Sequence, residues 1–469
     1  MPRAPATRDQ ADAYRYGLRR LEAALVRGDP VPLHEQIRSQ RRAALAGVVL
    51  GLLGLCGAAV LAAVSPRPQW SHQAVVVGAG SGAMYVVAHR PDRLVPVANL
   101  PAARLVLAAL RAGGSTDADP AAATPVTVPD DALDGAPRTP TAAVPGALAV
   151  RPGGPPIPPR WAVCDAVDPD GALTATTVVG GAAPIAAGPA ADGVLLEGPE
   201  GGTWLVTEGQ RHRVDVGDGR LVAAFGLTGR LPREVAPALL SVLPEGPPLV
   251  TPVVPARGEP APDGLPGRIG DVLVAHPVGG EPQHYVVLAG GLQEVPPLLA
   301  ELLRVASGER GPRAVDAAEL AGATVVDELP VDGWPAGAPR MREAAEAPVL
   351  CRTWTADGGG VWTGAALPVG DRSPVTLAQA DGPGERVDAV AIGAGGPVRA
   401  TAPGRAPGAG PLWLVSGTGV AHGVADDATA AALGITATEP APEAALRLLP
   451  TGPTLDAAAA GRTVDVLPN

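Results

Sequence analysis

The sequence contains no lysine, so all 36 of its basic residues are arginines. The GxxxxGK[ST] loop that holds nucleotide phosphates requires a lysine and is therefore excluded. The seven histidines form no HxxxH or HExxH pair, so their spacing predicts no metal site. No GxSxG motif occurs, and the scattered carboxylates give no reason to choose an acid–base pair. The sequence accordingly predicts no catalytic residue, no metal ligand and no cofactor-binding residue.

The sequence contains one candidate for a glycine-rich phosphate-binding loop. The one candidate, "VVVGAGSGAM" at 75–84, approximates GxGxxG after a strand-like run, but a second strand-like run, "MYVV", overlaps its end. A dinucleotide loop needs the N-terminus of a helix to hold the phosphates. We therefore predict a hairpin turn at this place.

Cysteine is scarce, with three residues in the whole chain. Cys56 lies in an apolar run, where a small apolar residue is ordinary. Cys164 and Cys351 lie in the long C-terminal part, where export to an oxidising compartment would permit a disulfide. Closing so long a loop would stabilise the fold by roughly 5 kcal/mol on the chain-entropy model.

Charge is absent from the apolar run near the start of the chain. The stretch "RSQRRAALAGVVLGLLGLCGAAVLAAVSPRPQW" has no charged residue from 43 to 64. A helix of this length rises about 33 Å, enough to cross a hydrocarbon core of about 30 Å. Too many residues precede the run for a cleaved signal peptide. We therefore predict a single transmembrane helix at 43–64.

Arginines are distributed unevenly around this helix. Arg27, Arg38, Arg41 and Arg42 lie close before it, whereas only Arg67 lies close after it. The positive-inside rule then predicts a cytoplasmic N-terminal segment and export of everything that follows the helix. The part before the helix holds nine arginines against five acidic residues, which leaves a net charge of −15 for the rest within the total of −11. An acidic exported region argues against nucleic-acid binding.

The cytoplasmic segment, 1–42, contains the sequence "DAYRYGLRRLEAALVRGDP". Tyr14, Leu18, Leu21 and Leu25 recur at helical spacing, which predicts an amphipathic helix of two to three turns that ends at Gly28. So short a helix cannot bury its apolar face alone. Two interpretations stay open, docking on a partner protein and lying on the bilayer surface.

The exported part repeats itself along the chain. "PVTVPDDALDGA" resembles "PRAVDAAELAGA", and the offset between them also aligns Cys164 with Cys351. A second kind of repeat links "TWLVTEGQRHRV" to "LWLVSGTGVAHGV" and "LPEGPPL" to "LPTGPTL", which places His212 opposite His422. The order is therefore A, B, A′, B′, in two tandem halves. If the halves pack with pseudo-two-fold symmetry, the two cysteines meet near the axis and can bridge.

We predict an α+β protein in which each repeat has strands, a glycine-containing turn and a short helix. The exported domain, 65–469, becomes an elongated body of four lobes around a β-rich, disulfide-stapled core. The segments 107–122 and 252–265 read as mobile connectors. The tryptophans are candidates for a sugar-binding groove, but they serve more often as core anchors. The lobes are expected at about 70–150, 192–255, 268–345 and 410–465, and the core at about 158–190 and 348–408.

The sequence resembles the EccB family, a membrane-core component of the actinobacterial ESX type VII secretion system. The resemblance begins with "TRDQADAYRYGLRRLEAALVRGDPVPLHEQIRSQRRAALAG" and continues through "LVPVANLPAARL", "WAVCDA", "YVVLAGGLQEV" and "APVLCRTW" to "LRLLPTGPTL". It implies a cytoplasmic segment, one crossing of the inner membrane, four periplasmic lobes and a disulfide between Cys164 and Cys351.

The resemblance also implies partners. These are an FtsK/SpoIIIE-type motor ATPase, a multi-span channel subunit, a further membrane subunit and a subtilisin-like periplasmic protease, with contacts between copies of the chain. The stripe Tyr14, Leu18, Leu21 and Leu25 is the expected cytoplasmic contact. A structural role in protein export is therefore predicted. The alternatives are an exported nucleotide hydrolase, since ATPase activity has been ascribed to the family, and a cell-wall-binding module.

Overall fold

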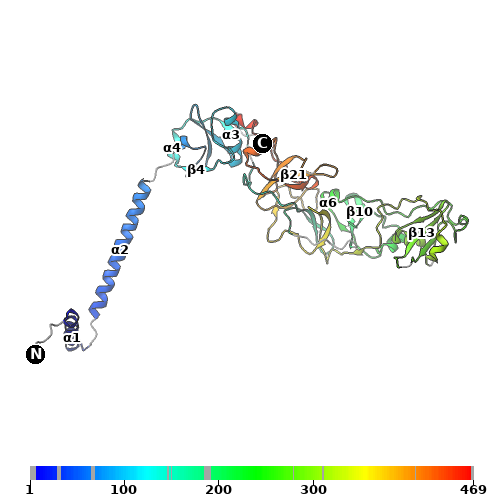
Figure 1. The fold of residues 1–469 in the computed structure, drawn as a ribbon, viewed down its shortest axis with the longest axis horizontal. Coiled ribbons are helices and arrows are strands. Elements are labelled where there is room, and N and C mark those ends of the chain that lie inside the picture. The colour runs from blue at the N-terminus through cyan, green and yellow to red at the C-terminus, as the bar shows by residue number, and fades with distance from the viewer. Residues whose placement is uncertain are drawn as a thin grey trace. The chain divides into compact units, whose positions relative to one another are not determined.

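The computed structural model describes residues 7–28, 33–64, 69–144, 147–148, 150–183, 192–277, 279–308, 311–406 and 408–465. The chain divides into two compact units, Met1–Pro68 and Gln69–Asn469, which we call unit 1 and unit 2. Figure 1 labels the main elements of both units.

Unit 1 contains, in its described part, the helices α1 (Arg8–Arg27) and α2 (Leu33–Val64). α1 ends at Gly28 as the sequence predicts, but it has 20 residues instead of two to three turns. The reason is a capping box at Thr7, which starts the helix well before Tyr14. α2 begins before the expected span of 43–64, because the Glu-, Gln- and Arg-rich residues ahead of that span are good helix formers.

Unit 2 contains, among the described residues, four small sheets with the same strand order, third–second–first–fourth. We call the segments that carry them lobes 1 to 4. Lobe 1 has β1 (Val75–Gly78), β2 (Met84–Ala88), β3 (Arg93–Val97), α3 (Leu100–Ala112), β4 (Pro125–Val128) and α4 (Asp130–Asp134). Lobe 2 has β8 (Asp192–Glu197), β9 (Thr203–Thr207), β10 (Gln210–Arg213), α5 (Gly219–Ala224), β11 (Arg233–Glu234) and α6 (Pro237–Val242).

The second half of the chain repeats the pattern. Lobe 3 has β12 (Val272–Ala275), β13 (Gln283–Leu288), β14 (Gly291–Glu294), α7 (Pro297–Ser307), β15 (Arg313–Val315) and α8 (Ala317–Leu320). Lobe 4 has β21 (Gly395–Thr401), β22 (Leu412–Ser416), β23 (Ala421–Gly423), α9 (Asp427–Ala432), β24 (Glu439–Pro442) and α10 (Glu443–Leu446).

One topology therefore underlies both kinds of sequence repeat. In each lobe three antiparallel strands are followed by a helix that crosses back, so the fourth strand pairs parallel with the first. A second short helix follows, and the chain then returns beside the third strand, as in the bridges Leu94↔Arg138 and Arg211↔Glu245. In lobe 1 the predicted hairpin is confirmed, because β1 and β2 flank the glycine-rich run and pair antiparallel.

A six-stranded sheet joins the two halves, in the order β18-β17-β6-β7-β20-β19. Its strands are β6 (Trp161–Val167), β7 (Leu173–Gly180), β17 (Val349–Thr355), β18 (Gly358–Gly364), β19 (Val375–Thr376) and β20 (Ala389–Ala391). β21 was expected in this core, within 348–408, but it pairs with β22 and β24 in lobe 4. The expectation was wrong because an apolar run does not specify which sheet it joins.

Short elements complete the described part of unit 2. They are η1 (Trp70–His72), β5 (Thr141–Ala142), η2 (Pro199–Gly201), β16 (Arg340–Met341), η3 (Ala459–Gly461) and β25 (Thr463–Val464). β25 pairs with β5, and β16 pairs with β8, so segments from the second half contribute strands beside the first half.

Lobes of the first half pack against lobes of the second half. One buried cluster combines α3 of lobe 1 with Leu433 and Leu455 of lobe 4, and the Arg104 guanidinium donates to the Leu433 carbonyl at 3.0 Å. A second cluster combines lobe 2 with α7 of lobe 3. The expected mobile connector at 107–122 is wrong at its start, because Leu107 lies buried within α3.

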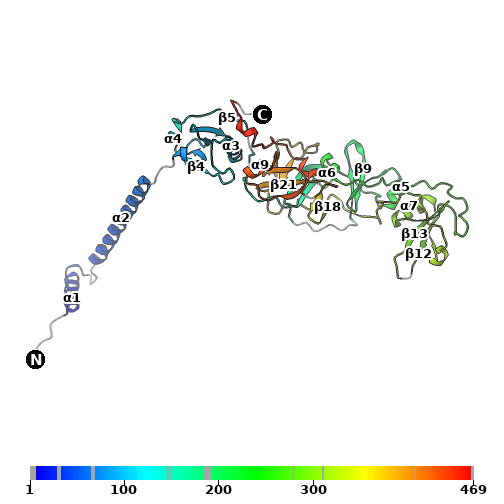
Figure 2. The same cartoon turned by 45° about the horizontal axis from the view of Figure 1, so that its top comes forward.

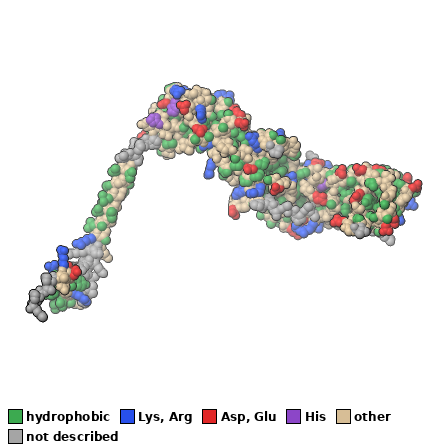
Figure 3. Space-filling model, in the orientation of Figure 1, with side chains coloured by type: hydrophobic (Ala, Val, Ile, Leu, Met, Phe, Trp, Pro, Cys, Tyr) green, Lys and Arg blue, Asp and Glu red, His purple; other side chains and the backbone are tan. Residues whose placement is uncertain are grey.

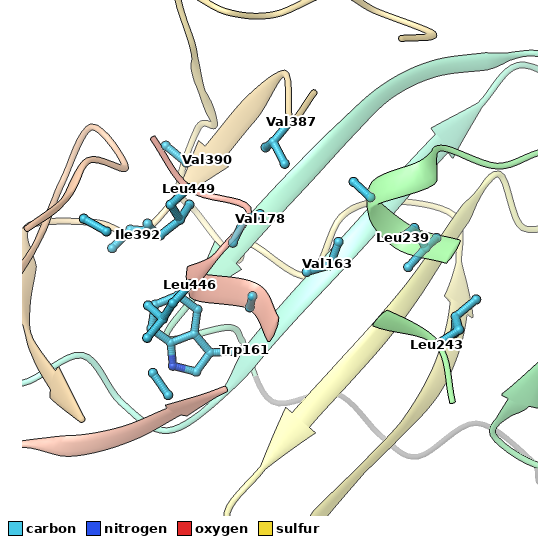
Figure 4. Packing of buried hydrophobic residues seen from close by; sticks show 14 of the residues in the cluster. Trp161, Val163, Val178, Leu239, Leu243, Val387, Val390, Ile392, Leu446 and Leu449 are labelled. Atoms are coloured by element: carbon cyan, nitrogen blue, oxygen red, sulfur yellow. The ribbon is translucent and has the colours of Figure 1, made fainter. Parts of the chain in front are cut away.

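The largest hydrophobic cluster covers one face of the six-stranded sheet. Leu239 and Leu243 of lobe 2 belong to the same cluster as Val163 of β6, and Figure 4 shows Leu446 of lobe 4 beside Trp161. The second helix of lobe 2, α6, and the second helix of lobe 4, α10, therefore both pack on the same sheet. Figure 2 shows this region with β21, α6 and β18 close together. The α+β class is confirmed, while the elongated outline stays a prediction.

Candidate functional site

The apolar face of α1 is exposed. Tyr14, Leu18, Leu21 and Leu25 lie on one side of the helix, and 70%, 49%, 62% and 85% of their respective surfaces are accessible. The Thr7 side chain accepts from the Gln10 amide at one end, and Gly28 takes a left-handed conformation at the other. Both ends of the helix are thus capped locally, and its stripe has no covering partner within the described residues.

α2 contains a segment with the properties of a membrane span. Its candidate window, Gln40–Leu61, has 22 residues and a mean hydropathy of 2.4, and none of it is buried in the structure. Figure 3 shows hydrophobic side chains along α2. A helix of this length matches the roughly 30 Å hydrocarbon core of a bilayer. The window starts slightly before the expected 43–64.

The predicted disulfide is present and joins two strands of the six-stranded sheet. Cys164 of β6 and Cys351 of β17 are direct neighbours in the antiparallel register, with Cα atoms 4.0 Å apart. Both side chains are fully buried, beneath Trp362 and Leu367. The bridge therefore covalently links the two halves at the point where their repeat-equivalent strands meet.

A buried carboxylate lies on the opposite face of the same sheet. Asp165 accepts a hydrogen bond from the Ala236 amide, which precedes α6, and another from the Thr176 hydroxyl, each at 2.8 Å. Burial raises the pKa of Asp165 to about 7; these two hydrogen bonds oppose that shift, and nearby Asp388 adds to it. Asp165 thus attaches lobe 2 to the sheet.

The glycine-rich turn of lobe 1 already holds an anion, which belongs to the chain itself. The Asp130 carboxylate accepts from the Gly80 amide at 2.7 Å, the Ser81 amide at 3.1 Å and the Ser81 hydroxyl at 2.6 Å. These hydrogen bonds lower the pKa of Asp130, the Ser81 hydroxyl contributing most. The loop amides that a phosphate would use are therefore engaged.

The matching histidines have the same structural role. Nδ1 of His212 donates to the Pro247 carbonyl, and Nδ1 of His422 donates to the Pro453 carbonyl, each at 3.0 Å. Burial lowers the pKa of both imidazoles. Each ring packs against a glycine of the returning segment, Gly246 or Gly452. No group of three or more metal-ligating side chains occurs in the described part of the chain.

Lobe 3 contains an open cavity of about 480 Å³. Its described lining includes three prolines and Trp334, and its ionisable groups are His284 and Glu294. No arginine lies among these lining residues. The arrangement lacks the cations that a polyphosphate requires.

Sequence reasoning found the disulfide and the α1 stripe but missed Asp165 and Asp130. The hydrogen bond from Ala236 to Asp165 spans 71 residues, so no local spacing predicts it. The sequence alone also did not decide between a sugar-binding and a core role for the tryptophans. Trp204 and Trp413 pack against the central cluster, which supports the core interpretation over the sugar-groove interpretation for these two.

Comparisons with known proteins match the whole chain. The family described as "Type VII secretion system ESX-1, transport TM domain B", EccB, matches residues 3–469. Of two Mycobacterium tuberculosis relatives, "ESX-5 secretion system ATPase EccB5" is 33% identical over 99% of this chain and 94% of its own length. "ESX-3 secretion system ATPase EccB3" is 31% identical over 98% of this chain and 90% of its own length.

Solved structures agree with this match. A chain from an intact ESX-5 inner membrane complex superposes with a TM-score of 0.70 at 32% identity, covering 100% of this chain and 98% of that one. An EccB3 dimer from the ESX-3 core complex gives 0.66 at 29% identity, covering 83% and 99%. By sequence and by fold over nearly its full length, the chain belongs to the EccB family of type VII secretion systems.

Proposed function

We propose that this chain is a membrane-anchored structural component of an ESX type VII secretion complex, which supports protein export and forms part of the periplasmic assembly. The observation that carries the proposal is the match to a chain of an intact ESX-5 inner membrane complex over the full length. The exposed apolar window of α2 supports an anchor in the inner membrane. The periplasmic assembly of the ESX-5 complex contains a similar chain, with a TM-score of 0.69.

The proposed orientation places the N-terminus in the cytoplasm and unit 2 in the periplasm. Arg27, Arg38, Arg41 and Arg42 lie close before the apolar span at 43–64 and only Arg67 lies close after it, which favours this direction by the positive-inside rule. A disulfide at the centre of unit 2 is compatible with an oxidising compartment. The cytoplasmic segment would be 1–42, the span 43–64 and the periplasmic domain 65–469.

The proposed partners are the other membrane subunits of the secretion core, namely a motor ATPase of the FtsK/SpoIIIE type, a multi-span channel subunit and a further membrane subunit. A subtilisin-like protease is a proposed periplasmic partner. The α1 stripe is the proposed cytoplasmic contact, because four large apolar side chains are exposed on a well-capped helix. Contacts between copies of unit 2 are also proposed, since a relative forms an EccB3 dimer.

Hydrolysis of nucleotide is the second candidate, because the relatives are named ATPases. We favour the structural role for two reasons. The chain has no lysine for a phosphate loop, and Asp130 occupies the amides of its glycine-rich turn. Purified full-length chain should release no phosphate from ATP above a detergent blank. Turnover that a single substitution abolishes would establish the hydrolase instead.

Affinity purification after mild detergent extraction tests the structural role. A tagged copy is expected to bring down the other secretion-core membrane subunits, and deletion of its gene should abolish secretion through that system. Recovery of the chain alone, with secretion intact in the deletion strain, would overturn the proposal. Pelleting of the chain with purified peptidoglycan under the same conditions would instead favour a wall-binding module.

A further inference from the structure

The edge strand β18 of the central sheet has an open side. β17 pairs with one side of β18, and among the described residues no strand pairs with the other. The strand reads GGGVWTG and contains neither proline nor a charged residue. Proteins usually protect edge strands with prolines or charged residues, because an open row of amides and carbonyls accepts another strand. β18 has no such protection.

The strand equivalent to β18 in the first half of the chain, β7, has a strand paired to its outer side. The pseudo-two-fold relation pairs β6 with β17 around the disulfide, and therefore β7 with β18. The outer side of β7 binds β20 in parallel, through Ala389, Val390 and Ala391. The first half of the sheet thus accepts an added strand at the position where the second half has none among its described residues.

Arg352 of β17 lies over β18, and it forms no ion pair with any residue that the structure describes. An Nη atom of its guanidinium lies 3.4 Å from the position that a Cβ would take at Gly359 of β18. The guanidinium stacks on Trp354 with 5.3 Å to the ring centroid, and its buried Nε has no hydrogen-bond partner in the described part of the chain. No carboxylate in the described residues forms an ion pair with it. Burial lowers the pKa of this arginine.

The two observations together specify a ligand. Gly359 has no side chain, and the guanidinium lies over β18 at this residue, on the face of the sheet that Arg352 shares with Trp354. A carboxylate on a strand added beside Gly359 would face that guanidinium, and a charge-assisted hydrogen bond would satisfy it. We propose that the outer edge of β18, with Arg352, binds an extended segment of a partner protein that carries an aspartate or glutamate, by strand addition.

A second copy of β18 fits this edge less well. Two copies paired through β18 would bring two Arg352 guanidinium groups to the same face of one sheet, where like charges repel. The uncharged strand adds no compensating carboxylate. The partner is therefore a different, acidic segment, and the proposal does not depend on the role in secretion.

Peptide binding tests the proposal on the full-length, oxidised chain in detergent. The probe is a fluorescein-labelled Ser-Val-Thr-Glu-Thr-Val-Ser peptide, and its match carries Gln in place of Glu. Fluorescence anisotropy should show the Glu peptide binding about tenfold more tightly, the scale of one charge-assisted contact. R352Q should reduce the difference to about twofold or less. Arg138, which also stacks on an aromatic ring at 5.3 Å, supplies the control R138Q, which should preserve it.

Backbone methylation of the peptide tests strand addition without changing the protein. Only alternate amides of an added strand face the edge. Of two Glu peptides N-methylated at alternating positions of opposite parity, one should lose binding and the other keep it. Equal binding by both, no binding at millimolar peptide, or unchanged Glu preference in R352Q would each overturn the proposal. Because methylation leaves the protein untouched, the result stands even if R352Q fails to fold.

Discussion

At the scale of single residues, Asp165 makes the stability of unit 2 depend on pH. Its pKa is raised from 3.8 to about 7 in the folded state, chiefly by burial. Well below the unfolded-state pKa of 3.8 the carboxyl is protonated in both the folded and unfolded states. Above that, ionisation favours the unfolded state, so the contribution is fully present at low pH and is lost as the pH rises through 7. The difference amounts to the order of 4 kcal/mol.

We therefore expect D165N to remove much of this dependence. An asparagine can accept from Ala236 and donate to the Thr176 hydroxyl, so both contacts have a replacement. Urea unfolding followed by tryptophan fluorescence at pH 5 and pH 8 gives the measurement. The variant should gain stability relative to wild type at pH 8, and the exposed control E385Q should not. Parallel pH profiles for D165N and wild type would show that Asp165 does not titrate in this range.

Gly246 is the second residue whose replacement has a definite expectation. A Cβ there would overlap the imidazole of His212, whose ring is held by the Pro247 carbonyl. G246A should destabilise the chain by about 1–3 kcal/mol, because a packed site must shift to admit the methyl group. G219A in the same lobe is the matched control, since nothing lies within 4 Å of its Cβ position. Thermal unfolding should separate the two variants; equal melting temperatures would contradict the packing argument.

At the scale of elements, α1 carries the proposed contact with a cytoplasmic partner. The double variant L18S/L21S removes two large side chains from the exposed stripe and leaves the capping box intact. Each leucine buried in an interface contributes about 1.5–3 kcal/mol, so recovery of the membrane subunits should fall at least about tenfold. A13S, about a quarter-turn around the helix from the stripe, should leave recovery unchanged. Undiminished recovery with L18S/L21S would move the contact elsewhere.

The disulfide is a contact between two elements, β6 and β17. Replacing both Cys164 and Cys351 with alanine should cost about 3–5 kcal/mol, because the bridge closes a loop of 187 residues. C56A is the natural control, since this free cysteine is exposed on α2. Denaturant midpoints of the non-reduced chains decide the matter. Coincident midpoints for the double variant and wild type would mean that strand pairing alone holds the halves together.

The elements also show how far the sequence predicts the structure. The hairpin at 75–84 and α1 were predictable because turn and helix signals are local. The parallel strand β4 was missed, since its partner β1 lies about 50 residues earlier and parallel pairing leaves no local signature. The two repeat types differ in sequence yet share a topology. Their common plan appears only when the strand orders are compared.

At the scale of the whole molecule, unit 2 is held together by packing between lobes of its two halves. Lobe 1 packs with lobe 4, and lobe 2 packs with lobe 3, while the disulfide links the strands between them. The duplication and the paired cysteines made the bridge predictable from the sequence. The environment of Arg352 was not predictable from the duplication, because its repeat counterpart is Asp165 and the two side chains differ completely in chemistry.

The orientation of the chain in the membrane can be measured on sealed spheroplasts. A copy with different epitope tags at its two ends should lose only the C-terminal tag when protease is added to sealed spheroplasts. The reason is the cluster of arginines close before the apolar span at 43–64, which should retain that side in the cytoplasm. A cytosolic marker must survive the same treatment. If the N-terminal tag were digested and the C-terminal tag protected, α2 would run in the opposite direction, and unit 2 could not belong to a periplasmic assembly.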